Sequence, residues 1–498
     1  MRSIALRLLL ACSLVLLPVG CSTESDPAAA AVLNVGATGE PDGLDPSTVS
    51  GAGTAFVLLY NVYETLVRLD GQGNIVPLLA TDWQVSADNR TYTFNLNPAA
   101  KFASGEQVTA QAVATSFQRI LDGTGTDTVK GQWAPVEEVV VVDEGTLEVK
   151  LKQASNRWLY DMTGIAGIVY DPAGLETLNT APAGSGPYEF VAWDQGNYVQ
   201  LKTNPDYWGD KPEVSEVYFR FFADPNAMNT AMLSGELDVI SNLTVPDSIG
   251  QFEGDDRFQV LEGSTDGEVV LGFNHQNEAL QELRVRQAIN HAIDRKALVA
   301  AVWGGKGQLI GSMVPPTDPW YTDLADTYPY DPARAKQLLA EAGYADGLQL
   351  RLRVPTLPYG PSAGRFVATQ LEEVGIDVVL DELEFPARWL DLVYTAGDYD
   401  LTIVAHVEPR DIVKFAEPEY YWHYDNPEFA KLIGQADSAD AESYVKLMGQ
   451  ASAMLAEDAA ADWLFLLPNL IITTKQVGGI EANATNLSFD LTHVTIER

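Results

Sequence analysis

The chain has 498 residues, with 69 acidic and 31 basic side chains and a formal net charge of −38. It is too long for one hydrophobic core, so two or three lobes are expected. The charge argues against a nucleic-acid binder, because no basic stripe is present to meet phosphates, and against contact of the folded body with a membrane surface. A solvated acidic surface is the simpler interpretation, with only a weak bias toward cationic solutes.

Residues 1–20 have the pattern of a secretory signal. Two arginines accompany an apolar run over residues 4–19, which is too short to remain as a membrane span. The run ends in Gly-Cys, which resembles the lipobox of bacterial lipoproteins, so Cys21 would carry a diacylglycerol and become the first mature residue. Pro18 departs from the usual lipobox residue, and a soluble secreted protein with a spare thiol is the alternative.

Cysteine usage favours the lipoprotein. The chain has two cysteines, and Cys12 would leave with the signal. Cys21 would then have no partner for a disulfide, and acylation would remove an exposed thiol. Residues 21–31 would form a short flexible tether, and loss of Arg2 and Arg7 would change the net charge from −38 to −40.

The first part of the mature chain, about 32–185, is predicted to mix strands and helices. Alternating side chains predict a strand at 91–96, and apolar residues at helical spacing predict a helix over 108–121. Residues 136–151 have the pattern of a hairpin that turns at Glu144-Gly145.

The second part alternates helices and strands more clearly. Apolar spacing predicts one helix over 283–303, and Asp331 followed by Pro332 is typical of a helix start. The order predicted after that is helix 331–344, strand 347–354, helix 362–375, strand 376–383, helix 386–397 and strand 399–405. This alternation predicts an α/β fold with a parallel sheet and right-handed crossovers, in which ligands bind beyond the carboxyl ends of the strands.

Four charged or titrating side chains follow the strand at 399–405. They are His406, Glu408, Arg410 and Asp411. They fit four interpretations: an acid–base set, a metal site that joins His406 and Glu408 to His423, a salt-bridged loop tip, or a clamp for a charged solute. Motifs of hydrolases, zinc proteases and P-loop proteins do not occur in the sequence, which disfavours the enzyme.

The clamp explains most of these residues. A carboxylate at a strand end that faces a cleft can hold a ligand ammonium, and closure of two lobes would strengthen the bond by removing water. Arg410 would then either pair with Glu408 or meet a ligand carboxylate. Tyr359 and the aromatic run at 420–424, which contains Trp422, would line an adaptable pocket, or would be ordinary core and loop residues.

Ordered stretches along nearly the whole mature chain resemble the family 5 solute-binding proteins of ABC importers, which include dipeptide- and oligopeptide-binding proteins. The similar stretches are 60–113, 184–190, 204–219, 231–240, 271–277 and 284–298. The resemblance implies an α/β, two-lobed clamshell of the type II periplasmic-binding-protein kind, with an extra subdomain in the first lobe. It also implies that the chain enters the second lobe near 269–274 and returns near 464–472.

The domain bounds implied by the resemblance cover the whole chain. They are a signal at 1–20, a tether at 21–31, lobe I at 32–270 with a subdomain at about 75–185, lobe II at 271–470, and a return to lobe I at 471–498.

The resemblance also implies roles for the charged cluster. Peptide-binding members have an acidic residue in a W-x-x-D-x-x-D-P-like segment, and residues 405–411 lie at that place. Glu408 would hold the peptide ammonium, Asp411 would brace the loop, and His406 stands near the family's tryptophan. The backbone from Ala405 to Val407 would add strand-like bonds to an extended peptide.

Departures from the family pattern limit the assignment of a substrate. Leu357 stands before Pro358-Tyr359, where dipeptide binders tend to have an arginine for the ligand carboxylate. Glu408 in place of aspartate moves the charge by one methylene. The stretch 94–98 lacks the basic residue that members usually have before its proline. A longer peptide or another amine-bearing solute is therefore more plausible than a dipeptide.

The sequence thus predicts a monomeric, lipid-anchored, extracytoplasmic receptor that needs no cofactor. It would capture a peptide and present it to a permease driven by an ATPase, without chemistry on the solute. One alternative is a binder of a metal chelate, opine, sugar or other non-peptide solute. Another is an envelope regulator that has the same fold and has lost transport.

Overall fold

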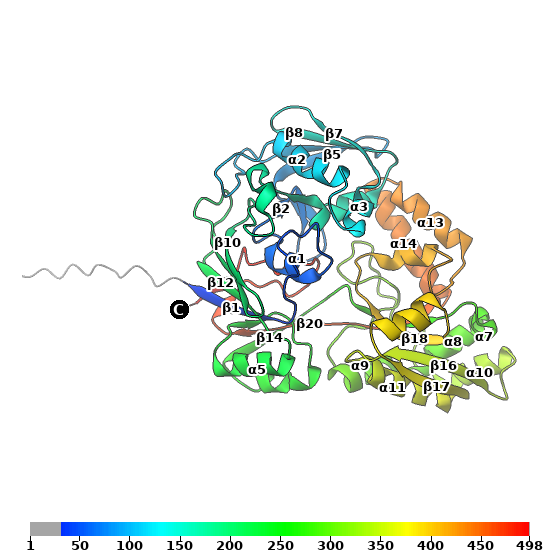
Figure 1. Ribbon diagram of the computed structural model, residues 1–498. Coiled ribbons are helices and arrows are strands. Elements are labelled where there is room, and N and C mark those ends of the chain that lie inside the picture. The colour runs from blue at the N-terminus through cyan, green and yellow to red at the C-terminus, as the bar shows by residue number, and fades with distance from the viewer. Residues whose placement is uncertain (1–30, 498) are drawn as a thin grey trace, which may run out of the picture.

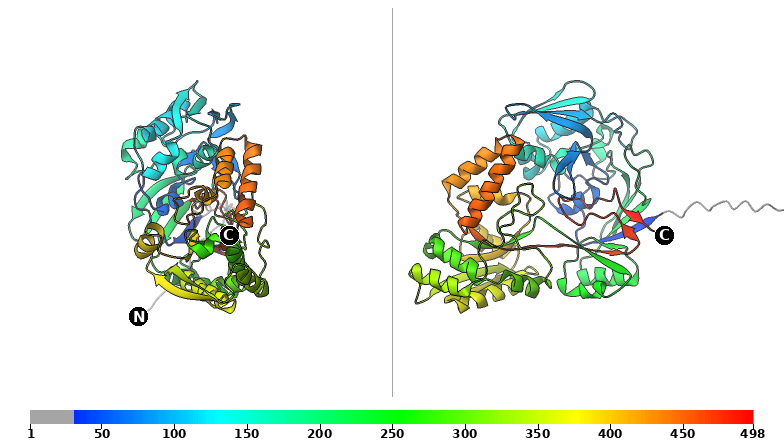
Figure 2. Two further views of the ribbon diagram at one scale, coloured as in Figure 1. Left: turned by 90° about the vertical axis from the view of Figure 1, so that its right-hand side faces the viewer. Right: turned by 180° about the vertical axis from the view of Figure 1, so that it is seen from behind.

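The structure is a computed structural model that describes residues 31–497 (Figure 1). We call the body around its seven-stranded sheet the first lobe and the body around its five-stranded sheet the second lobe. A four-stranded sheet with helices α2, α3 and α4 forms the subdomain, which lies beyond the first lobe in all three views (Figures 1 and 2). The predicted signal and Cys21 lie outside the described residues.

The sheet of the first lobe is mixed. Its strands, in spatial order, are β10 (Tyr188–Asp194), β11 (Tyr198–Thr203), β12 (Glu216–Phe221), β1 (Val32–Ala37), β13 (Val239–Ile240), β20 (Asn469–Thr474) and β14 (Phe258–Gly263). The central β1 runs parallel to both β12 and β13, and its Leu33 and Val35 are fully buried. Its helices are α1 (Ala52–Leu58), α5 (Pro225–Ser234) and α6 (Gly250–Glu253).

Three two-stranded ladders and three short 3-10 turns complete the first lobe and the links to the subdomain. The ladders are β2 (Glu64–Thr65) with β9 (Ile168–Val169), β3 (Val67–Leu69) with β4 (Ile75–Pro77), and β21 (Val477–Gly478) with β22 (Thr495–Ile496). The 3-10 turns are η1 (Ile165–Gly167), η2 (Pro172–Thr177) and η3 (Pro246–Ser248).

The subdomain confirms the elements predicted for its part of the chain. Its antiparallel sheet has the order β5 (Ala80–Val85), β6 (Thr91–Leu96), β8 (Thr146–Leu151) and β7 (Val136–Val141). The helices are α2 (Ala110–Leu121), α3 (Asp127–Trp133) and α4 (Asn156–Asp161). Strand β6, helix α2 and the β7–β8 hairpin are the predicted elements, and alternate residues of β6 and β8 face one aromatic core.

The second lobe carries a five-stranded sheet covered by helices. Its strands, in spatial order, are β17 (Ile376–Leu383), β16 (Leu348–Pro355), β18 (Leu401–His406), β15 (Glu268–Phe273) and β19 (Ala461–Leu466). The helices are α7 (Glu278–Gln281), α8 (Leu283–Ala292), α9 (Arg295–Trp303), α10 (Pro332–Glu341), α11 (Gly360–Glu373), α12 (Ala387–Trp389), α13 (Pro427–Asp437) and α14 (Ala441–Glu457). The helical turns η4 (Leu390–Thr395) and η5 (Asp411–Ala416) follow α12 and β18.

The parallel arrangement predicted from residues 331–405 is confirmed for its three strands, and the sheet has two further strands that are antiparallel. Strands β17, β16 and β18 are parallel, as the alternation of helices and strands predicted. Strand β15 is antiparallel to both β18 and β19. Its partners lie more than a hundred residues away along the chain, and local periodicity contains no information about such pairing.

The predicted helix over 283–303 is also corrected. It is broken into α8 and α9, because Asp294 leaves the helical conformation and its side chain accepts a hydrogen bond from the amide of Ala297 at 3.0 Å. Asp294 is therefore an N-cap. The helix predicted at 386–397 is a short turn, α12, that continues as the π-helical η4.

The chain passes between the two large sheets at two places within residues 31–497. One crossing segment, 264–267, joins β14 to β15, and the other, 467–468, joins β19 to β20. Two adjacent crossings are the usual geometry of a hinge. The exact domain bounds implied by the family resemblance stay a prediction.

The subdomain also touches the second lobe away from these crossings. The side chain of Asn156 donates to the carbonyls of Ala436, Asp437 and Ala439, and the hydroxyl of Ser155 lies 3.1 Å from a carboxylate oxygen of Asp437. These contacts fix α4 against the turn between α13 and α14; Figure 1 shows these two helices next to the subdomain on the right of the molecule.

Candidate functional site

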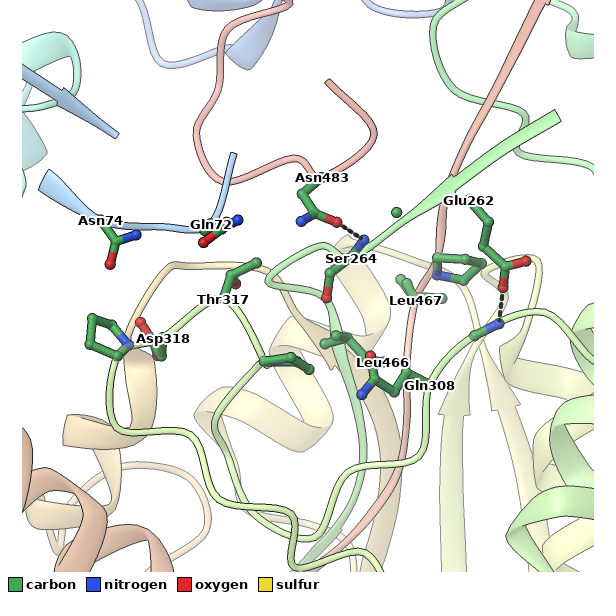
Figure 3. A pocket seen from close by; sticks show the side chains of 15 residues that line it. Gln72, Asn74, Glu262, Ser264, Gln308, Thr317, Asp318, Leu466, Leu467 and Asn483 are labelled. Atoms are coloured by element: carbon green, nitrogen blue, oxygen red, sulfur yellow. Dashed lines mark hydrogen bonds between the residues drawn. The ribbon is translucent and has the colours of Figure 1, made fainter. Parts of the chain in front are cut away.

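A cavity of about 550 Å³ lies where the two lobes and both crossing segments meet (Figure 3). Its lining is Gln72, Asn74 and Asn483 from the first lobe; Glu262, Gly263, Ser264, Leu466, Leu467 and Pro468 from strand ends and crossing segments; and Gly307, Gln308, Pro316, Thr317, Asp318 and Pro319 from the second lobe. The volume is in the range of small-ligand pockets, and the lining is rich in side chains that can form hydrogen bonds.

A tight turn brings the first lobe to this cavity. The carboxylate of Asp70 accepts hydrogen bonds from the amides of Gln72 and Asn74, both at 2.9 Å. Gly73 has a φ of 78°, and a Cβ at this residue would lie 2.1 Å from the carbonyl oxygen of Thr317. Only glycine therefore permits both the turn and the close approach of the two lobes.

The cluster at 405–411 is organised around a buried histidine. His406 ends β18, with its Nδ1 3.0 Å from Oδ2 of Asp411 and its Nε2 2.8 Å from the hydroxyl of Tyr421. Both ring nitrogens are therefore engaged inside the protein. In the antiparallel ladder His406 stands opposite Glu268, so their side chains share one face of the sheet.

Glu408 lies at the surface of the same cluster. Its side chain is exposed, and among residues 31–497 it has no basic partner within 4.0 Å. One of its carboxylate oxygens lies within 4.8 Å of ligand atoms of both His406 and Asp411. The structure thus brings these three residues together, and the predicted metal partner His423 is not among them.

Arg410 does not pair with Glu408 in this structure. It is only 7% exposed, and its Nε donates to Oδ1 of Asp318 at 3.3 Å. Its guanidinium lies 3.6 Å from the ring centre of Tyr160 and 4.7 Å from that of Trp320. Tyr160 belongs to α4, so this arginine of the second lobe lies against the subdomain.

Asp318, which bonds Arg410, lies near three further carboxyl groups, and all four have perturbed pKa values. Burial and the neighbouring Asp318 raise the pKa of Asp266 to about 8, and burial raises the pKa of Asp318 to about 6. Burial, with Asp411 close by, raises the pKa of Glu268 well above its usual range. Burial likewise raises the pKa of Asp411, against the effect of its bond to His406.

The other predicted residues lie around the end of β18. The buried hydroxyl of Tyr359 accepts a hydrogen bond from the amide of Ala405 at 2.7 Å, so this amide is already used inside the protein. Val407 is 61% exposed, and Leu357 packs against the core of the second lobe. Trp422 is only 1% exposed and stacks on Phe415 at 4.0 Å, so it is a core residue here and leaves no surface for a solute.

Sequence reasoning did not find three of the four carboxyl groups near Arg410. Asp266 lies in a crossing segment, Glu268 begins a strand in which every residue is buried, and Asp318 follows three residues of a Pro-rich turn. A glutamate at the head of an otherwise apolar run was the available signal for Glu268. The approach of Asp318 to Arg410 spans 92 positions and has no local signal.

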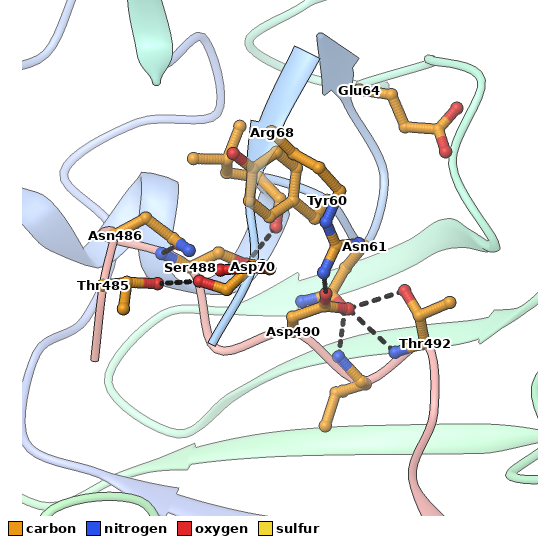
Figure 4. A network of polar contacts seen from close by, with 12 residues as sticks. Tyr60, Asn61, Glu64, Arg68, Asp70, Thr485, Asn486, Ser488, Asp490 and Thr492 are labelled. Atoms are coloured by element: carbon orange, nitrogen blue, oxygen red, sulfur yellow. Dashed lines mark hydrogen bonds and ion pairs between the residues drawn. The ribbon is translucent and has the colours of Figure 1, made fainter. Parts of the chain in front are cut away.

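A second buried polar network lies in the first lobe (Figure 4). Arg68 donates to Oδ2 of Asp490 at 2.7 Å and covers the ring of Tyr60, while Oδ1 of Asp490 accepts from the amide and hydroxyl of Thr492. The neighbouring Glu64 accepts from two donors, the hydroxyl of Tyr207 at 2.8 Å and the indole of Trp208 at 3.1 Å. These carboxylates are fully partnered.

The two lobes, the paired crossing segments and the cavity between them define a binding protein that holds a solute at the junction of its lobes. The model of the bacterial extracellular solute-binding proteins, family 5 Middle, matches residues 74–409. The chain therefore belongs to this family, whose members bind solutes outside the cytoplasm for ABC importers and are not enzymes.

Relatives of this chain are named for different solutes. It is 32% identical over 381 residues to a protein of Brucella ovis named as an ABC transporter peptide-binding protein. The aligned region covers 73% of this chain and 70% of that protein. It is 30% identical to heme-binding protein A of Haemophilus influenzae, with coverage of 62% and 61%. It is 28% identical to the dipeptide-binding protein of Escherichia coli K12, with coverage of 66% of both chains.

Solved structures agree with the two-lobed fold. HbpA2 from Haemophilus parasuis superposes with a TM-score of 0.84 at 22% identity, over 94% of this chain and all of that one. The agropinic acid complex of AgaA from A. tumefaciens R10 has a TM-score of 0.71 at 25% identity, over 94% of this chain and 99% of that one. Within residues 31–497, no helix is long and apolar enough to cross a membrane.

Proposed function

We propose that this protein is the lipid-anchored receptor of an ABC importer and that it captures a peptide between its two lobes for delivery to the permease and its ATPase. The observation that carries the proposal is the cavity between the lobes, whose amide, hydroxyl and carboxylate groups suit a peptide backbone. The relatives named for peptides and dipeptides support it.

In this proposal the solute stabilises the closed arrangement of a monomeric receptor. Glu408, which has a free charge at the end of β18, takes the peptide ammonium, and Asp411 braces the loop through His406. Exposed ion pairs contribute little, so Glu408 gains strength only when closure removes water from the pair. The peptide shifts the population toward the closed form by its differential affinity.

Calorimetric titration with peptides of two to six residues tests the proposal. Free peptides should bind, and their N-acetylated forms should bind about tenfold more weakly, because acetylation removes the ammonium that Glu408 holds. Glu408→Gln should weaken the free peptide by a similar factor and leave the acetylated peptide unchanged.

Glu419→Gln is the matched control, since Glu419 is an exposed carboxylate of the same region outside the cluster. It should bind like the wild type. If no peptide of any length binds the wild type, the peptide receptor is wrong. Equal binding of free and acetylated peptides would contradict the role of Glu408 in holding the ammonium but would not contradict the peptide receptor.

A metal chelate is the second candidate solute. His406, Glu408 and Asp411 offer ligand atoms within 4.8 Å of one another, and relatives are named for heme and nickel. A metal would need to displace Tyr421 or Asp411 from His406. Elemental analysis of protein incubated with nickel or iron, with and without small chelators, separates this candidate from the peptide receptor.

The lipid anchor is tested separately. Cys21→Ser should abolish incorporation of labelled palmitate and release the protein from the membrane fraction. A wild-type protein that is already in the soluble fraction would favour the secreted alternative.

A further inference from the structure

The carboxyl groups near Asp318 are incompletely partnered. Oε2 of Glu268, Oδ2 of Asp318 and Oδ1 of Asp411 are buried and have no hydrogen-bond partner within the described part of the chain. Their residues are 2%, 9% and 5% exposed. Buried carboxylates are ordinarily hydrogen-bonded or paired, so three unpartnered oxygens in one cluster require an explanation.

The three residues with unpartnered oxygens belong to one connected cluster. Arg410 bonds the other oxygen of Asp318, His406 bonds the other oxygen of Asp411, and Glu268 stands opposite His406 in the sheet. Asp266 lies two residues before Glu268 and raises the pKa of that group. Arg157 is a further cation at the edge of the cluster: its Nε lies 3.7 Å from Asp161, and one of its terminal nitrogens donates to the carbonyl of Arg410 at 3.4 Å, so it bonds none of the three unpartnered oxygens.

Arg410 itself is held in the way that a protein holds a bound guanidinium. Two aromatic rings, Tyr160 and Trp320, lie within cation–π distance of its guanidinium, and Asp318 accepts its Nε. Its backbone has a φ of 59°, which disfavours a residue other than glycine, asparagine or aspartate. The side chain of Arg410 thus contacts two aromatic rings and one carboxylate, while its backbone is strained.

We infer that Asp318, with its acidic neighbours, forms a subsite for the guanidinium or ammonium group of a basic solute, and that Arg410 occupies this subsite until the solute displaces it. The inference rests on the proposed capture of a solute between the lobes. Asp318 links the two features, because it lines the cavity (Figure 3) as well as bonding Arg410. A cationic group of a solute in the cavity would therefore reach Asp318, whose unpartnered Oδ2 could accept a charge-assisted hydrogen bond from it.

The inference separates two roles of Arg410. As an occupant, it competes with the cation of the solute, and its removal strengthens binding. As a partner of a ligand carboxylate, or as a latch that merely holds the subdomain, its removal weakens binding of every solute. Arg410→Met distinguishes these roles, since methionine keeps an unbranched stem beside the rings of Tyr160 and Trp320 and lacks the charge.

The test is a calorimetric titration of the full-length mature protein with three matched tripeptides, Ala-Arg-Ala, Ala-citrulline-Ala and Ala-Ala-Ala. Citrulline keeps the shape of arginine and removes its charge. The wild type should bind the arginine peptide at least tenfold more tightly than the citrulline peptide. Arg410→Met should bind the arginine peptide about tenfold more tightly than the wild type does, and its gain for Ala-Ala-Ala should be smaller, because that peptide has no side-chain cation.

Asp318→Asn is the second variant, and its fold is checked by circular dichroism. It should lose most of the preference for arginine over citrulline, and this ratio compares two peptides on the same variant. Equal binding of the arginine and citrulline peptides by the wild type would overturn the inference and leave the peptide receptor standing. Weaker binding of all three peptides by Arg410→Met would overturn the displacement.

Failure of the proposed function has a different signature. If none of the three tripeptides binds, arginine, agmatine and spermidine are titrated as non-peptide cations. Binding of these cations, weakened by Asp318→Asn, would support the cation subsite while the peptide assignment fails. Absence of binding to all six probes would overturn both.

Discussion

The two buried polar networks of this protein differ in how completely their charges are compensated. In the first lobe, Arg68 and Asp490 form one ion pair, and both oxygens of Asp490 and of Glu64 have donors (Figure 4). Near Arg410, three buried carboxylate oxygens have no partner within residues 31–497.

The difference separates structural charge from charge that is ready for a ligand. A fully partnered network fixes the backbone segments that contribute to it and leaves nothing to bind. The first-lobe network joins residues near 60–70 to the returning segment at 485–492, so it holds two distant parts of the chain together. The cluster near Arg410 has three unpartnered carboxyl oxygens, and in our inference a solute supplies a donor to them.

The largest expected effect is on stability in the first lobe. Arg68→Met leaves Asp490 without its cation and should lower the free energy of unfolding by about 2–4 kcal/mol, since breaking a largely buried pair strands the remaining charge. Urea denaturation measures the change.

The control for this substitution is Arg257→Met, which breaks the exposed pair with Asp255 and should leave stability nearly unchanged. If Arg68→Met lowered the free energy of unfolding no more than its control does, the first-lobe network would not have the stabilising role that we assign to it.

A smaller effect, of opposite sign, is expected for Glu268→Gln. The folded state raises the pKa of Glu268, so its contribution to stability is full below the unfolded pKa of about 4.5 and is lost as pH rises. Glutamine removes the buried charge and should therefore stabilise the protein at pH 8 by about 1 kcal/mol, with no gain at pH 4. Thermal unfolding across this range measures the difference.

Glu64→Gln is the matched substitution in the paired network. Burial raises the pKa of Glu64 to about 7, so its pH dependence has the same sign, between about pH 4.5 and 7. Glutamine cannot accept from both Tyr207 and Trp208, however, so this variant should be less stable than the wild type at pH 4. If the two variants changed stability in the same way at every pH, the two networks would not differ as we describe.

The smallest effect is expected at the contact between the subdomain and the second lobe. Asn156→Ala removes donors to three carbonyls and should change the free energy of unfolding by less than Glu268→Gln does, because water can replace these donors once the lobes separate. Small-angle scattering should find the solute-free variant more open. A variant as compact as the wild type would mean that these bonds do not hold the lobes together.

Local sequence signals predicted much of the fold. Asp331 caps α10, with its side chain 2.9 Å from the amide of Arg334, and the parallel strands β16, β17 and β18 follow from the alternation of helix and strand patterns. The break at Asp294 was missed because the apolar spacing continues through it, although an aspartate inside a helical pattern is a candidate cap.

The site was predictable only where its residues are near each other in the sequence. His406, Glu408 and Asp411 lie within six positions and do come together. The partners of Arg410 come from Tyr160 and from residues 318–320, which are distant in sequence and reach it only through the packing of the lobes. Burial of Trp422 could not be read from an aromatic run, which has the same composition in a core and in a pocket.

The most direct measurement is a crystal structure of the protein with Ala-Arg-Ala bound. We predict that the peptide guanidinium lies within hydrogen-bond distance of Asp318 and that Arg410 has left its place between Tyr160 and Trp320. A complex in which Arg410 still stacks on both rings, with the peptide cation in solvent, would contradict the account.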